Sequence, residues 1–236
     1  MKYVISLSGK KQSGKDTVGK FLQELINTKE KKNYGILNNV KLLSFAEPLK
    51  KLTKQFLNTV YNIDVSEEHL NGKFKEIPLF DCFNNPIMVK TLYRNSAAAL
   101  YNEQVTTGKL LQLIGTEFGR NFINCNIWVE TCFNKICMDI NTTKWFILTD
   151  TRFPNEIAYM QKNLNILNKI NPVKFLSVRI IRESLEKKIN ITENKDTHSS
   201  ETALDDYNFD VTIHNDSDLD YLKKQIITFF NSILKQ

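Results

Sequence analysis

Apolar residues in this chain follow two spacings, one typical of buried strands and the other of amphipathic helices. Five short apolar runs predict strands, at residues 3–7, 40–45, 145–148, 175–181 and 209–213. Helical spacing follows the first two runs and returns further along, at residues 110–114, 127–140 and 219–234. Strands that alternate with helices in this way indicate an α/β fold built on a doubly wound parallel sheet.

The stretches between these elements predict how the chain is organised. Residues 61–106 are rich in charge and asparagine and show weak periodicity, which favours an insertion or flap over core structure. Residues 183–199 are also polar, which suits a lid. We therefore predict one domain over residues 1–236, with an insertion and helical lobe at 61–140 and a lid at 183–199.

The composition says more about which classes of partner to expect than about the fold. The net charge is +6, yet the lysines are scattered rather than clustered, so we expect no nucleic-acid polymer as a partner. The four cysteines form no CxxC pair and have no histidine at zinc-finger spacing, which favours reduced thiols. No segment approaches the roughly 20 apolar residues of a membrane span, so we expect a soluble cytoplasmic protein with no membrane partner.

Residues 9–17 carry the most specific chemical signal, GKKQSGKDT, which fits the Walker A spacing GxxxxGK between a predicted strand and a predicted helix. Gly9 and Gly14 permit turns that bring backbone N–H groups around phosphates, and the helix beginning near Lys15 adds its positive dipole end. Lys15 can reach the β- and γ-phosphate oxygens of ATP. The predicted ATP contacts in this loop are Gly9, Lys11, Gln12, Ser13, Gly14, Lys15, Asp16 and Thr17.

The loop departs from the general pattern directly after its lysine. Asp16 stands where a serine or threonine usually ligates magnesium, and Thr17 comes one residue later. The sequence GKDT resembles the GKGT of nucleoside monophosphate kinases more than the GKS or GKT of motor and GTP-switch proteins. The Mg²⁺ contact stays open between Thr17, Asp16 and bridging waters, because Mg²⁺ commonly keeps several waters beside one or two protein ligands.

Three further motifs and the phosphate loop together resemble one family. They are LLQLIGTEFGR at residues 110–120 with Trp128 after it, LTDTRFPNE at 148–156, and DTHSSETAL at 196–204. In this order and spacing they resemble the phage-type deoxynucleoside monophosphate kinases nearly end to end. The resemblance implies a P-loop NTPase fold, with a five-stranded parallel sheet flanked by helices, a helical acceptor-binding lobe and a lid. It also implies Mg²⁺-assisted, in-line transfer of the γ-phosphoryl group of ATP to a deoxynucleoside 5′-monophosphate.

The DTR motif is where the resemblance implies catalytic roles. Asp150 would hold magnesium through water or orient the acceptor, although an aspartate here could also cap the next helix. Arg152 would clamp the acceptor phosphate or the migrating phosphoryl group with two prongs. Glu156 would support that arginine or bind the sugar, and a solvated helix residue is the alternative. The predicted catalytic residues are Lys15, Asp150 and Arg152, and the predicted metal ligands are Asp16, Thr17 and Asp150.

The second motif implies contacts with the acceptor. By resemblance Gln112 would meet the base, Gly115 and Thr116 would let the base approach the backbone, and Arg120 would hold phosphate. Gln112, Thr116 and Arg120 have the spacing that places them on one helix face. Trp128 would stack on the base or wall it, and a plain core position is the alternative.

Basic residues outside these motifs complete the predicted site. Lys10 and Lys11 lie in the phosphate loop itself, where they could bridge donor and acceptor phosphates. Arg182 lies beside the predicted lid and is expected to contact ATP.

Two other functions stay open at this point. An animal-type phosphomevalonate kinase shares the SGK…SGKD loop, the PLK element after the second strand and a DTR motif. A P-loop module that binds ATP without phosphorylating a metabolite is the other alternative. We favour the deoxynucleoside monophosphate because of the LLQLIGTEFGR motif, and by resemblance a homodimer is plausible.

Overall fold

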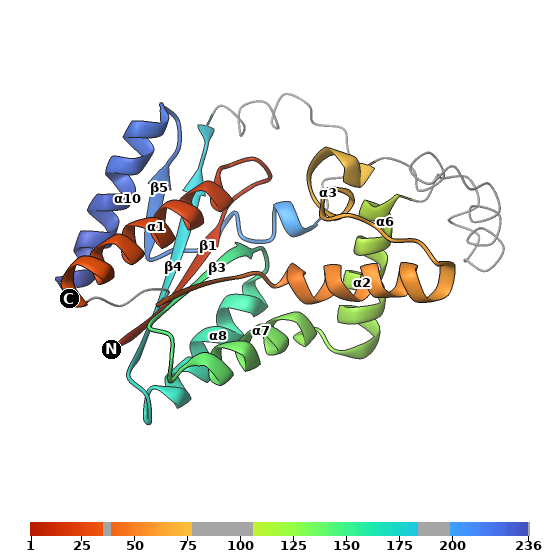
Figure 1. Ribbon diagram of the computed structural model, residues 1–236, viewed down its shortest axis with the longest axis horizontal. Coiled ribbons are helices and arrows are strands. Elements are labelled where there is room, and N and C mark those ends of the chain that lie inside the picture. Colours follow the sequence, from red (N-terminus) through yellow and green to blue (C-terminus); the bar gives the residue numbers. More distant parts are fainter. Residues whose placement is uncertain (35–38, 77–105, 184–198, 236) are drawn as a thin grey trace. The chain divides into compact units, whose positions relative to one another are not determined.

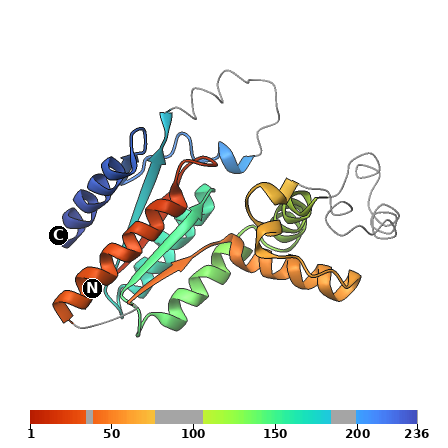
Figure 2. The same ribbon diagram turned by 45° about the horizontal axis from the view of Figure 1, so that its top comes forward.

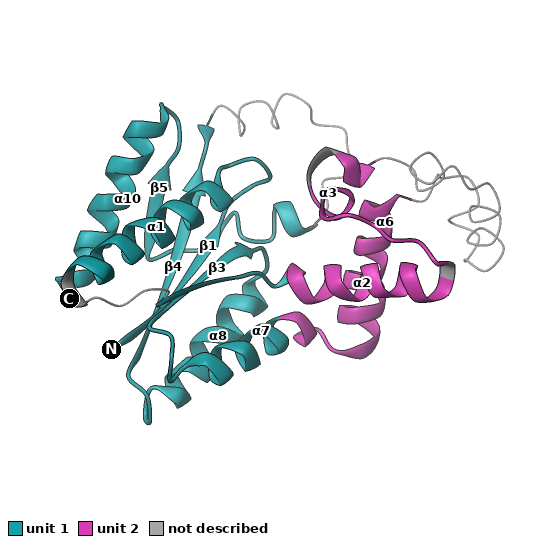
Figure 3. Cartoon of the chain, viewed as in Figure 1, with its two compact units in different colours: residues 1–45, 129–236 teal, residues 46–128 magenta. Residues whose placement is uncertain are grey.

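The computed structural model describes residues 1–34, 39–76, 106–183 and 199–235. These residues belong to two compact units, which Figure 3 colours separately. The first unit joins residues 1–45 to residues 129–236, and the second contains residues 46–128. Two predicted segments, residues 77–105 of the insertion and 184–198 of the lid, lie outside the described residues.

The first unit is built on a five-stranded parallel sheet with strand order β2-β3-β1-β4-β5 (Figure 1). Its strands are β1 (Lys2–Ser8), β2 (Val40–Leu43), β3 (Trp145–Thr151), β4 (Val173–Ile181) and β5 (Val211–His214). Parallel neighbours require crossover connections, and helices cover both faces of such a sheet. This is why the strands read as nearly continuous apolar runs.

Among the described residues, four helices cover the two faces of this sheet. They are α1 (Lys15–Tyr34), α7 (Ile127–Asp139), α8 (Pro154–Leu167) and α10 (Leu219–Leu234). Figures 1 and 2 show α1 and α10 along one face and α7 and α8 along the other. On the α1 and α10 side, Trp145 stacks on Tyr3 with ring centroids 4.1 Å apart and meets Phe230 of α10 at 5.4 Å. This packing anchors the strands whose carboxyl ends carry the site.

The second unit is helical. It contains α2 (Ala46–Tyr61), α3 (Glu67–Leu70), the 3₁₀-helix η1 (Gly72–Glu76), α6 (Thr107–Gln112) and the π-helix η3 (Leu113–Ile123). Its own core comprises Leu57, Ile63, Val65, Leu70, Leu110 and Leu111, with Leu49 and Ile114 packed against it. The unit therefore has a hydrophobic centre separate from that of the sheet.

The predicted α/β fold is confirmed, with four differences in detail. The strand expected at residues 145–148 continues to Thr151. Its last three residues are polar, so the apolar pattern ended the predicted strand too early. The helix expected at residues 110–114 becomes a π-helix after Gln112, and helix α8 was not among the predicted elements. The second unit spans residues 46–128, whereas the insertion and lobe were predicted at 61–140, and that division of the chain stays a prediction.

Candidate functional site

The phosphate loop joins the end of β1 to the start of α1, and its backbone requires glycine at two positions. Gly9 has φ +156° and Gly14 has φ +99°, while Gln12 between them has φ +66°. A Cβ atom on Gly9 would lie 2.5 Å from the carbonyl oxygen of Ile180. The loop can therefore wrap tightly beside β4 only because these two residues lack side chains.

Lys15 is buried within this loop and is held by its carbonyl groups. Its Nζ donates to the Gly9 carbonyl at 2.5 Å and to the Lys10 carbonyl at 2.7 Å, and the residue is 8% exposed. Burial, followed by the nearby positive charge of Arg152, lowers the pKa of Lys15 from 10.5 to about 8. The carboxylates of Glu201, Asp16 and Asp150 oppose this shift. Lys15 therefore loses its positive charge as the pH rises through about 8.

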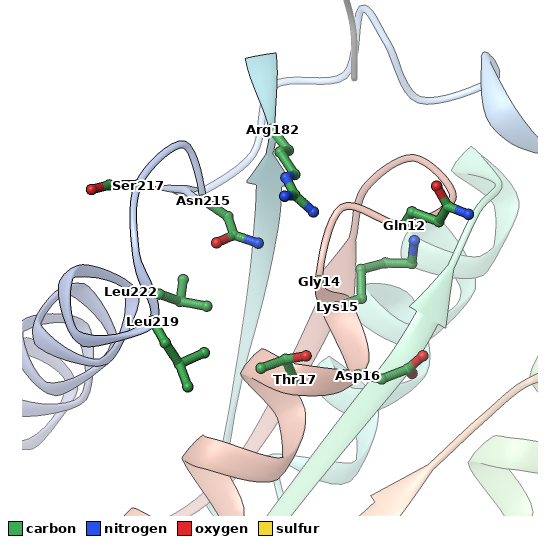
Figure 4. Close-up of a pocket in the computed structure, with 10 residues that line it drawn as sticks. All are labelled: Gln12, Gly14, Lys15, Asp16, Thr17, Arg182, Asn215, Ser217, Leu219 and Leu222. Carbon is green, nitrogen blue, oxygen red and sulfur yellow. The ribbon is translucent and has the colours of Figure 1, made fainter. Parts of the chain in front are cut away.

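A cavity of about 460 Å³ opens beside the loop (Figure 4). It is lined by Gln12, Gly14, Lys15, Asp16, Thr17, Arg182, Asn215, Ser217, Leu219 and Leu222. In Figure 4 the Arg182 and Asn215 side chains extend toward the loop, from the ends of β4 and β5. The predicted ATP contact Arg182 therefore lies in the same pocket as the loop. The cavity combines cationic groups for phosphates with the apolar Leu219 and Leu222.

Asn215 is a functional candidate that the sequence analysis missed. Its Nδ2 donates to the carbonyl of Ser13 at 2.9 Å, and a Cβ atom on Gly14 would lie 2.5 Å from the same nitrogen. The signal that could have found it is its position directly after β5, because ligands of open α/β sheets bind at the carboxyl ends of strands. Asn215 therefore fixes the loop from across the pocket.

Asp150 is aimed by an irregularity in the pairing of β1 with β3. From Ser6 to Ser8 strand β1 advances two residues, while β3 advances three, from Leu148 to Thr151. The extra residue is a bulge, a device that redirects side chains near functional sites. The Asp150 carboxylate accepts from the Phe45 N–H at 2.8 Å and from the Ser44 hydroxyl at 2.6 Å.

Glu156 sets the backbone that follows Asp150. Its Oε2 accepts from the N–H of Arg152 at 2.8 Å and from the N–H of Phe153 at 3.1 Å. Glu156 is 2% exposed, so the alternative of a solvated helix residue is wrong. The N-cap of α8 is Phe153, with Glu156 supplying the cap carboxylate, so the alternative that Asp150 caps this helix is also wrong.

The donor atoms around Lys15 suit a hard divalent cation. Asp16 and Thr17 line the cavity from the first turn of α1, and Asp150 lies close enough to Lys15 to influence its pKa. All three offer oxygen ligands, which Mg²⁺ prefers. The residues present thus fit Mg²⁺ bound together with nucleotide phosphates.

The other two lysines of the phosphate loop each contact a nearby acid, Lys10 through its side chain and Lys11 through its backbone. Lys10 Nζ lies 3.0 Å from Asp205 Oδ2, and the side chains are 15% and 35% exposed. The N–H of Lys11 donates to Glu201 Oε2 at 2.7 Å. Glu201 also pairs with the Arg152 guanidinium.

The acceptor contacts predicted from the second motif lie in the second unit, where Gln112 ends α6, the next three lie in the π-helix and Trp128 follows it. Gln112 is exposed, and Thr116 and Arg120 are half-buried. Trp128 is 6% exposed, and its indole N–H donates to the Gly115 carbonyl at 2.9 Å. A base-stacking role for Trp128 stays a prediction. The structure shows that the indole links Trp128 back to the π-helix that precedes it.

Glycines make that packing possible. A Cβ atom on Gly115 would lie 2.7 Å from Leu49 Cδ2, and one on Gly119 would lie 2.7 Å from Trp128 Cζ2. The Leu49 side chain therefore fills the space beside Gly115, and the approach of a base to that backbone stays a prediction. π-Helices are rare and are frequently found at functional sites.

Three comparisons with known proteins bear on this site. The sequence model of the family described as deoxynucleotide monophosphate kinase matches residues 73–226, more than half of the chain. The deoxynucleoside-5′-monophosphate kinase of Escherichia phage T5 is 26% identical over 233 residues, covering 86% of each chain. A crystal structure of shikimate kinase from Bacteroides thetaiotaomicron aligns over all of both chains with 13% identity and a TM-score of 0.36.

Proposed function

Since the chain belongs to the deoxynucleotide monophosphate kinase family and is a nucleotide kinase, we propose that it transfers the γ-phosphoryl group of ATP to deoxynucleoside 5′-monophosphates. The family match covers residues 73–226 and does not include the phosphate loop. The loop is therefore independent support for the donor half of the reaction. The observation that carries the proposal is the joining of Lys15, Gly14 and Arg182 in one pocket.

The donor binds in the cavity beside the loop. Phosphoryl transfer requires chiefly in-line positioning and neutralisation of charge on the migrating group. Backbone N–H groups of the loop hold the phosphates at the amino end of α1, with Lys10, Lys11 and Ser13 beside them. Lys15 leaves the Gly9 and Lys10 carbonyls and turns to the β- and γ-phosphate oxygens. The nucleoside of ATP then lies toward Arg182 and Asn215.

The chemical step belongs to Lys15, Asp150 and Arg152. Bound by Asp16, Thr17 and Asp150, Mg²⁺ would neutralise phosphate charge and orient the β- and γ-phosphate oxygens. Arg152 grips the phosphate with its planar guanidinium, and Glu156 holds the backbone of that arginine. No general base is needed, because the acceptor phosphate is already a nucleophile as a dianion.

The acceptor is held by the second unit. Gln112, at the end of α6, is exposed and would meet a base edge. In the π-helix, Thr116 would let the base approach the backbone and Arg120 would hold phosphate. Gly115 and Trp128 maintain the shape of that segment. Among the described residues no helix has the length and apolar character needed to cross a bilayer, and the cytoplasmic location, the homodimer and the absence of a nucleic-acid partner stay predictions.

A panel of acceptors tests this function. Purified protein is incubated with ATP and Mg²⁺ and with dTMP, dGMP, dCMP, dAMP or phosphomevalonate, and ADP and the phosphorylated product are measured. We expect turnover with at least one deoxynucleoside monophosphate and loss of about 10² to 10³ in rate in Lys15→Ala. Turnover with phosphomevalonate alone would replace the proposed acceptor, and ATP binding without any turnover would favour the non-catalytic alternative.

A further inference from the structure

One short segment between β4 and β5 places two carboxylates against the phosphate loop and two neighbouring arginines. The segment begins with the 3₁₀-helix η4 (Ser199–Glu201) and continues to Asp205. Glu201 accepts from the Lys11 N–H at 2.7 Å through Oε2 and pairs with the Arg152 guanidinium through Oε1. Asp205 pairs with Lys10 at 3.0 Å and with Arg179 at 2.7 Å.

Glu201 has the contacts that a phosphate oxygen would make in this loop. A backbone N–H near the start of a helix and a planar guanidinium are two of the groups with which proteins bind phosphate. The Glu201 side chain is 23% exposed and that of Arg152 is 33% exposed, so the pair lies at the rim of the loop, where an incoming anion can reach it. Its negative charge also acts on Lys15.

We propose that Glu201 is an internal substitute for phosphate, which occupies the anion site of Lys11 and Arg152 until a nucleotide phosphate displaces it. The proposal rests on the proposed function, because it assumes that phosphates bind at this loop. A backbone N–H carries one hydrogen and is satisfied by one strong acceptor. The Lys11 N–H therefore serves either the Glu201 carboxylate or a phosphate oxygen, and the two anions compete.

Competition of this kind lowers the affinity of the resting enzyme for phosphate. When the binding-competent state is populated only in part, the apparent dissociation constant rises by the inverse of that fraction. A site that Glu201 occupies about nine-tenths of the time would bind phosphate about tenfold more weakly than a vacated one. Burial would raise the pKa of Glu201, but the charge of Arg152 and the Lys11 N–H outweigh it and hold the pKa below its usual value. The competing carboxylate is therefore ionised throughout the neutral range.

Pyrophosphate is a suitable probe because it offers phosphate oxygens without a base or sugar. Its dissociation constant is measured by calorimetry for the full wild-type chain, Glu201→Gln, Glu201→Ala and the control Asp206→Asn. Asp206 is exposed in the same segment, so its replacement removes one negative charge without vacating the anion site. The melting temperature of each protein is recorded with and without pyrophosphate, which shows whether each variant is folded.

We expect both Glu201 variants to bind pyrophosphate about five- to tenfold more tightly than wild type, while Asp206→Asn changes little. Their melting temperatures should fall without pyrophosphate and rise more than that of wild type when it is added. Equal or weaker binding by both Glu201 variants overturns the proposal, and so does an equal gain in Asp206→Asn. Absence of pyrophosphate binding in every protein overturns the proposed function of the loop as well. If the Glu201 variants bind pyrophosphate more tightly but the protein shows no kinase turnover, Glu201 remains the internal substitute for phosphate and only the proposed kinase function is overturned.

Discussion

Glu156 Oε2 accepts a 2.8 Å hydrogen bond from the N–H of Arg152, and this carboxylate is almost completely buried. The same oxygen accepts from Phe153 at the start of α8, so one acid both begins the helix and fixes the turn that carries the arginine. An arginine grips phosphate with two prongs only if its backbone is held in place. The PNE sequence after Arg152 thus links the folding of a helix to the geometry of the site.

Replacing Glu156 by Gln is expected to lower both stability and turnover. The amide keeps an oxygen but loses the charge that two backbone N–H groups now share. Loss of a buried charged acceptor costs about 1 to 3 kcal/mol of unfolding free energy, measured by urea denaturation. We expect kcat to fall with it, whereas Lys162→Ala on the exposed side of α8 should change neither. Unchanged stability and kcat in Glu156→Gln would remove its positioning role.

The depressed pKa of Lys15 predicts how donor binding depends on pH. Below about pH 8 the ammonium group of the free enzyme is charged and attracts phosphate, and above that value the charge is lost. The pH profile of kcat/KM for ATP reports groups of the free enzyme, so it should decline above about pH 8. Lys15→Arg stays charged throughout this range, so its profile should lack the decline even if its rate is low. A wild-type profile that is flat to pH 10 would contradict the prediction.

The fold could be predicted because burial on both faces leaves a strong mark on a parallel strand. The five apolar runs and the final helix at residues 219–234 were correctly located from this signal. The π-helix at Leu113–Ile123 could not be predicted, because its apolar residues have ordinary helical spacing. That spacing indicates a helix but does not distinguish i→i+5 from i→i+4 bonding.

Site residues could be predicted where a local sequence motif sets the backbone conformation. They could not be predicted where the contacts come from residues distant in the sequence. The Walker A spacing identified the loop from Gly9 to Lys15, since its glycines are needed for positive φ angles. Asn215 and Glu201 act on that loop from about 190 to 200 residues away, and no spacing rule connects them with it. The roles assigned to Gln112 and Arg120 stay predictions.

Asn215→Ala is expected to weaken ATP binding. The substitution leaves the Ser13 carbonyl without its side-chain donor and loosens the phosphate loop across the pocket. One lost hydrogen bond is worth about 0.5 to 1.5 kcal/mol, or roughly two- to tenfold in the dissociation constant. Gln225→Ala is the matched control, because this amide bonds to the His214 backbone beside Asn215 and does not line the cavity. Equal ATP affinity in wild type and Asn215→Ala would exclude Asn215 from the donor site.

Gly119→Ala is expected to disturb the acceptor unit while sparing the donor site. The new methyl group would lie 2.7 Å from the indole of Trp128, so the ring or the π-helix must shift. Overpacking of this kind costs about 1 to 3 kcal/mol of unfolding free energy. We expect a higher KM for the nucleoside monophosphate and an unchanged dissociation constant for ATP. Phe122→Ala is the control, since that side chain is 80% exposed on the same helix. A normal acceptor KM in folded Gly119→Ala would show that this packing does not shape the acceptor site.

The last prediction concerns recognition of the base by Gln112. This side chain is exposed, so replacing it by Ala should leave the unfolding free energy nearly unchanged and isolate any effect on binding. An amide both donates and accepts hydrogen bonds, which lets it pair with the edge of a base. We expect Gln112→Ala to raise KM for the preferred deoxynucleoside monophosphate and to change the ranking among bases, while KM for ATP moves little. Unpaired polar partners cost about 1 to 3 kcal/mol, or roughly 5- to 150-fold in kcat/KM. Asn121→Ala removes a second exposed amide, from the π-helix that follows Gln112, where it bonds to Glu117, and should preserve the ranking. Equal effects of the two substitutions would mean that Gln112 does not read the base.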